Sequence, residues 1–172
     1  MSKSKKNRSG LVLLLIFVIF ALATASCFMP FADGIVMKGT GLGSLFNGGH
    51  YNGFELIFGK KNDSGDQVIE ACTMLIVAFA MMAAGAVLAF FGLGCGLAKK
   101  KTGIAKALGI FGGLLALAAG IFFLLSKQVL DLDNLSSSLG SVTYNLGVGF
   151  LLPGIFGCTA GAGAICIILA SL

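Results

Sequence analysis

Four long apolar stretches constrain the fold of this chain more than any other feature. They cover residues 11–29, 68–98, 103–125 and 146–172. A helix needs roughly 20 apolar residues to cross the hydrocarbon core of a bilayer, and each stretch has about that length. Apolar residues make up 57% of the chain and charged residues 11%, which is not the balance of a soluble domain. We therefore predict an all-α membrane protein in which residues 1–172 form a single four-helix transmembrane domain.

The first stretch also fits a second interpretation, a cleavable secretory signal. It follows a basic run, Ala23 and Ala25 form an Ala-x-Ala pattern, and Cys27 follows small residues as a lipobox cysteine does. Two features favour a retained helix instead. The apolar run exceeds the roughly 7 to 15 residues of a signal core, and Thr24 stands where a lipobox prefers Leu. Cleavage after Ala25 would leave three helices.

The distribution of basic residues predicts how the chain is oriented. Lys and Arg near membrane spans stay on the cytoplasmic side, whereas acidic residues have little influence. Acid-free basic clusters lie in and beside residues 1–10 and 99–102, and they contain Lys3, Lys5, Lys6, Arg8, Lys99, Lys100, Lys101 and Lys106. The connections 30–67 and 126–145 mix both signs. We expect a multi-pass cell-membrane protein with cytoplasmic termini, so the net charge of +5 reflects topology and not a nucleic-acid partner.

The long first external loop, residues 30–67, contains alternating residues and turn signals. These predict two or three short β-strands, with two of them around residues 35–38 and 54–58. A segment of this length cannot bury much core alone. Its larger apolar side chains should therefore pack on the helix ends or at the lipid interface, and they are Phe46, Tyr51, Phe54, Ile57 and Phe58. The second external loop, residues 126–145, is short, polar and serine-rich, and its start can extend the third helix.

This layout, with a large strand-bearing first loop and a short second loop, resembles that of claudin-type proteins. The resemblance covers the order and size of the segments along the chain. The claudin signature also requires a Trp and a cysteine pair in the first loop, but this chain has no Trp and residues 30–67 contain no Cys. The resemblance therefore implies the four-helix layout alone, and the family's function is not carried over.

Among the four apolar stretches, the first contains no glycine and the last three are rich in glycine. Small residues four positions apart let helices approach closely in a membrane. The pairs are Gly92 with Gly96, Gly109 with Gly113, and Gly157 with Gly161. We interpret them as packing positions within the chain, with dimerisation as the alternative. Pro153 lacks a backbone donor, so the fourth helix should bend around Gly149 and Phe150.

Few residues suggest chemistry. Glu70 is the only acid in a predicted span, in the first turn of residues 68–98, where it is either an intramembrane polar site or a carboxylate at a helix N-terminus. Cys27 and Cys72 fall at similar depth near the outer face, either as a disulfide or as two free thiols. His50 is the sole histidine and has no ligand or nucleophile at a diagnostic spacing. We predict no catalytic, metal or cofactor site.

These observations predict a non-enzymatic interaction or accessory subunit that uses its outer loop and glycine-rich helix faces. Its expected partners are the lipid bilayer and another membrane protein or a second copy of itself, without nucleic acid or cofactor. The alternative is a small transporter or channel subunit, with Thr73, Thr159 and Glu70 lining a path. A membrane thiol oxidoreductase using Cys27 and Cys72 is a third hypothesis, although the chain has no C-x-x-C motif.

Overall fold

The computed structural model describes residues 2–39, 50–61, 67–98, 102–130 and 142–170. Within these ranges, four helices are long and apolar enough to cross a membrane. They are α1 (Ser2–Phe28), α3 (Thr73–Leu97), α4 (Thr102–Leu124) and α7 (Val148–Leu169). The predicted four-helix membrane bundle is confirmed.

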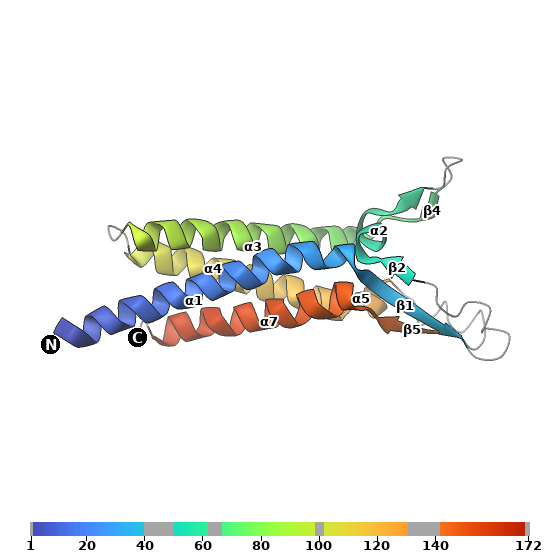
Figure 1. Cartoon of the computed structure of the whole chain (residues 1–172). Helices are drawn as coiled ribbons and strands as arrows, with labels where there is room; N and C mark the ends of the chain where they lie inside the picture. Colours follow the sequence, from blue (N-terminus) through green and yellow to red (C-terminus); the bar gives the residue numbers. More distant parts are fainter. Residues whose placement is uncertain (1, 40–49, 62–66, 99–101, 131–141, 171–172) are drawn as a thin grey trace.

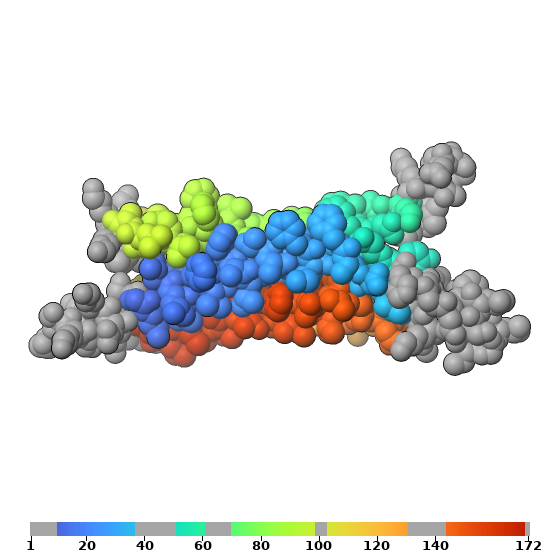
Figure 2. Space-filling model, viewed as in Figure 1, coloured from blue at the N-terminus to red at the C-terminus, as the bar shows by residue number. Residues whose placement is uncertain are grey.

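Each of the four helices packs against two neighbours, and one pair of diagonally opposite helices is also in contact. The helices α1 and α4 each pack against both α3 and α7, and they also touch each other across the middle. Figure 2 shows α1 and α7 side by side across one face of the bundle. The starts of α1 and α4 and the ends of α3 and α7 lie at one end of the bundle, called here the terminal end, and a small β-sheet stands at the other, the sheet end (Figure 1).

The sheet contains three antiparallel strands in the order β2-β1-β5. These strands are β1 (Asp33–Gly39), β2 (His50–Asn52) and β5 (Val142–Leu146). Ile35 in the central strand lies opposite Tyr51 on one side and Leu146 on the other. The strand predicted around residues 35–38 is thus confirmed. The strand from the second connection was not predicted, and it joins the two connections into one sheet.

The predicted strand at residues 54–58 is wrong, because this segment is the short helix α2 (Gly53–Phe58). Asn52 caps the helix: its side-chain oxygen accepts a hydrogen bond from the Phe54 backbone N–H at 2.9 Å. Glu55 stands three residues after Asn52, which is the spacing of a capping box. Gly59 ends the helix with a φ of 84°, a conformation that favours glycine.

Two spans begin later than their composition predicted. Gln67–Ile69 form the strand β4, which pairs with β3 (Lys60–Lys61), so the second span starts only at Thr73. The fourth span starts at Val148, because the residues just before it belong to β5. Apolar strand residues next to a span make it look longer in the sequence. Only their pairing with another strand distinguishes them from residues of the membrane helix. The third span ends at Leu124, and the short helix α5 (Ser126–Val129) follows it.

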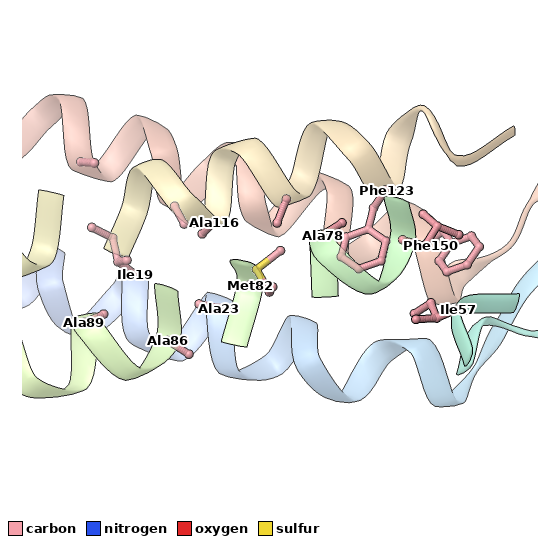
Figure 3. Packing of buried hydrophobic residues seen from close by; sticks show 14 of the residues in the cluster. Ile19, Ala23, Ile57, Ala78, Met82, Ala86, Ala89, Ala116, Phe123 and Phe150 are labelled. Carbon is pink, nitrogen blue, oxygen red and sulfur yellow. The ribbon is translucent and has the colours of Figure 1, made fainter. Parts of the chain in front are cut away.

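One hydrophobic core runs through the bundle and continues beneath the sheet. Toward the terminal end it consists of small residues around Ile16 and Ile19 of α1. Toward the sheet end the buried side chains are larger, and Figure 3 shows Phe123 of α4 and Phe150 of α7 side by side, with Ile57 of α2 close to them. The sheet end is therefore packed onto the helices and not tethered loosely to them.

Candidate functional site

The sheet and its neighbouring elements form one unit, called here the sheet module: residues 29–39, 50–61, 67–69 and 142–147. The chain leaves α1 through a 3-10 helix, η1 (Met29–Phe31), and the segment after it receives hydrogen bonds from both connections. The Gly53 N–H donates to the Ala32 carbonyl at 3.0 Å, and the Gly147 N–H donates to the Gly34 carbonyl at 2.8 Å. These bonds hold both connections against the end of the first span.

Glycines at this junction allow backbone segments to touch. A Cβ atom on Gly34 would lie 2.6 Å from the Gly53 Cα, and one on Gly149 would lie 2.6 Å from the Ala32 carbonyl oxygen. A Cβ on Gly53 would lie 2.9 Å from the Pro30 carbonyl oxygen. Real side chains do not approach backbone atoms this closely. The position of the sheet module on the bundle is therefore set by direct backbone contact.

Four phenylalanines form a cluster beside this junction, called here the phenylalanine cluster: Phe31, Phe54, Phe58 and Phe79. The rings of Phe31 and Phe54 are nearly parallel with centroids 4.7 Å apart, and Phe54 lies 4.6 Å from Phe58. The rings of Phe54 and Phe58 are both nearly perpendicular to the ring of Phe79 in α3, with centroids 5.8 Å apart in each pair. Phe54 and Phe58 thus pack on a helix end as expected, yet Phe31 remains 60% exposed and Phe58 43%.

An ion pair lies at the polar side of α2. The Lys60 Nζ lies 2.8 Å from the Glu55 Oε1. The hydrogen bond to Glu55, with the charge of that carboxylate, raises the pKa of Lys60 above its ordinary value. Because the pair is exposed to solvent, it contributes little stability. The solvent exposure of both side chains shows that this side of α2 is accessible to water.

Tyr144 on β5 is buried, and this burial raises the pKa of its phenol, with a smaller contribution from Tyr51. A raised pKa in the folded state means that the neutral phenol stabilises the fold fully below the unfolded value of about 10. This contribution is lost as the pH rises through the folded pKa. The sheet module should therefore loosen in alkali.

We predict this alkaline titration directly. The chain has two Tyr and no Trp, so a Tyr51→Phe variant leaves Tyr144 as the sole tyrosine. The ultraviolet absorbance of the phenolate should then show a midpoint above about 10 in the folded protein and a lower one in denaturant. Identical midpoints in the two states would contradict the burial of Tyr144.

The six glycines predicted for helix packing all lie against other helices of the same chain. A Cβ on Gly92 would meet the Ala105 carbonyl, and one on Gly113 would meet the Ala160 carbonyl at 2.9 Å. The remaining contacts join Gly96 to Leu13, Gly109 to Ile16, Gly157 to Gly120, and Gly161 to Leu117. These glycine faces are therefore occupied by contacts within the bundle.

The residues proposed for a transport path do not come together. Glu70 is exposed in the connection between β4 and α3, outside the span that begins at Thr73, and not in a first helical turn as predicted. The reason is the pairing of β4, which takes the residues before Glu70 out of the helix. Thr73 and Thr159 are also exposed, and the Thr159 hydroxyl donates to the Ile155 carbonyl of its own helix. Pro153 lies buried inside α7.

The cysteines and the histidine do not form a reactive cluster in the described part of the chain. Cys27 and Cys72 are free thiols, each half-buried, as are the thiols of Cys95 and Cys158, while Cys166 is exposed. The backbone of His50 belongs to β2. No group of three or more His, Cys, Asp or Glu residues among the described residues could hold a metal ion.

Two features of the site were missed by sequence reasoning. The strand β5 carries Val142, Thr143 and Tyr144, which are residue types that favour strands, and that signal was available. The roles of Phe31 and Phe79 depend on contacts between distant segments, for which the sequence carried no signal. No protein-family model matches this chain, and no curated protein matches it significantly.

Proposed function

We propose that this protein is a non-enzymatic accessory subunit of the cell membrane whose sheet module is the contact surface for another membrane protein. One observation carries the proposal: β1 and β5 unite the two connections in a single sheet that shares its core with the bundle. A surface held rigid before binding loses less conformational freedom on contact, which favours affinity. The sheet module is thus suited to recognition.

The proposal includes an orientation, with the sheet module outside the cell and both termini in the cytoplasm. The starts of α1 and α4 and the ends of α3 and α7 share one end of the bundle (Figure 1). The acid-free basic clusters adjoin this terminal end in the sequence. Basic residues flanking spans favour the cytoplasmic side, which supports this orientation.

A site-specific photo-crosslinker tests the contact in living cells. Asn145 is exposed on β5, and a crosslinker at this position should yield one discrete adduct whose mass identifies another membrane protein or a second copy. The same crosslinker at Phe111, an exposed position within the span of α4, should yield no discrete protein adduct.

A second variant tests whether the adduct needs an intact sheet. A Cβ atom on Gly147 would collide with the Asp33 backbone, so Gly147→Val should displace β5 and abolish the adduct at Asn145. Gly103→Val is the matched control, since a Cβ there meets nothing within 4 Å. The proposal fails when Asn145 gives no adduct or when the adduct survives Gly147→Val unchanged.

A further inference from the structure

The phenylalanine cluster lies where two spans end. Phe31 is the last residue of the first apolar span, and Phe79 lies in the second turn of α3, which begins at Thr73. Phe54 and Phe58 are one turn apart on α2, so both project from the same side of that short helix. The cluster therefore covers the seam between α1 and α3 at the sheet end. In Figure 2 the end of α1 and the segment of α2 adjoin on one face there.

The face of α3 that carries Phe79 continues as membrane-facing surface. Phe90 lies about three turns further along α3 on the same face, because an α-helix has about 3.6 residues per turn. Phe90 is 55% exposed, and its ring contacts Phe20 of α1 at 5.6 Å. The exposed rings of the cluster thus belong to a seam that already faces lipid within the span.

A charged residue lies beside the phenylalanines of α2. From the pitch of an α-helix, Glu55 stands roughly 80° around α2 from the mean direction of Phe54 and Phe58. The far side of the helix carries the buried Leu56. Glu55 forms its ion pair with Lys60, and both side chains reach solvent. A surface that places exposed aromatic rings next to a solvated ion pair is suited to the boundary between headgroups and acyl chains. Phe is among the residues that form the apolar face of helices lying in the bilayer interface. The ion pair of Glu55 and Lys60 fits the headgroup layer, and the phenylalanine rings fit the upper acyl chains.

We propose that the phenylalanine cluster is immersed in the interfacial layer of phospholipid, so that α2 lies in the membrane surface and anchors the strands β1, β2 and β5 of the sheet module. The occupant of this apolar surface is lipid, since the surface continues into the membrane-facing side of α3. With α2 in contact with lipid, the strands β1, β2 and β5 are the part of the sheet module that is accessible to a protein partner. This inference rests on the membrane spans and not on the proposed contact function.

Tryptophan fluorescence in reconstituted vesicles tests the proposal. The chain contains no Trp, so Phe58→Trp introduces a single reporter at a ring that is 43% exposed. The full chain is reconstituted into phosphatidylcholine vesicles in which lipid is brominated either near the headgroup or near the chain ends. Emission should be lost more strongly to the shallow bromine than to the deep one, and acrylamide in the water should quench it weakly.

Two matched reporters calibrate depth. Phe111→Trp lies in the middle of the span of α4 and should be quenched more by deep bromine. Asn145→Trp on β5 is exposed and should be quenched by acrylamide but not by bromine. Phe31→Trp repeats the measurement in case Phe58→Trp does not fold. A reporter at Phe58 or Phe31 that behaves like Asn145→Trp, or is shielded from both quenchers by a protein partner or second copy, overturns the proposal.

Discussion

Replacing Gly157 with leucine is expected to destabilise the bundle strongly. The helices α4 and α7 meet at this point with their backbones in contact. A Cβ on Gly157 would lie 2.7 Å from the Gly120 Cα and would also meet the Ala116 carbonyl. These are backbone atoms that cannot move aside locally, so the two helices must separate. Forcing extra volume into a packed core costs about 3 kcal/mol at the upper end of the usual range.

The measurement is the free energy of unfolding in detergent micelles, followed by circular dichroism. Gly94→Leu is the matched control on α3, because a Cβ at Gly94 meets nothing within 4 Å. That variant should retain its stability, since leucine also favours the helix more than glycine does. Equal stability of Gly157→Leu and Gly94→Leu would show that the contact between α4 and α7 is not as close as described.

The second large effect is expected for Phe150→Ala. Phe150 is fully buried, its ring lies 5.8 Å from that of Phe123, and both lie close to Ile57 beneath the sheet module (Figure 3). Removing a buried phenylalanine typically costs about 3 to 5 kcal/mol, because the surrounding residues fill the cavity only in part. Since this core joins the bundle to the sheet module, the loss should be largest there.

Hydrogen exchange followed by mass spectrometry checks where the loss occurs. Phe150→Ala should speed amide exchange in β1 and β5 more than in α3 or α4. Phe111→Ala removes a ring of the same size that is 62% exposed, and exchange in the two strands should stay unchanged. Uniform acceleration over the whole chain in Phe150→Ala would contradict the proposed role of this core.

The helices were predictable because their signal is local and strong. Lipid offers no hydrogen bonds to backbone groups, so a long apolar run has essentially the helix available to it. The number of spans followed from this constraint. The glycines at contact positions were predictable for another reason, because small residues four positions apart let helices approach closely. The ends of the spans were less predictable: Val68 and Ile69 count as apolar span by composition, and only pairing with Lys60–Lys61 places them in a strand.

The sheet end was harder to predict because it depends on contacts between distant segments. The segment Gly53–Phe58 has aromatic residues that favour strands, but the cap at Asn52 and the turn at Gly59 decide for a helix. The strand β5 acquires its structure by pairing with β1. Glu70 was misplaced for the same reason, since the strand before it delays the start of α3. No local sequence pattern indicates that Phe31 contacts Phe54, or that Phe54 contacts Phe79, because these residues are far apart in the sequence.

The pairing of β1 with β5 has a consequence for how the protein is made. Ile35 is synthesised soon after the first span, whereas its neighbour Leu146 appears only when the fourth span is about to follow. Until then β1 presents an unpaired edge, which is the feature that invites wrong association. Pairings between residues this far apart in the sequence also form slowly. Completion of the sheet is therefore a late step of biogenesis, and a chain truncated before the fourth span leaves β1 without one of its two neighbours.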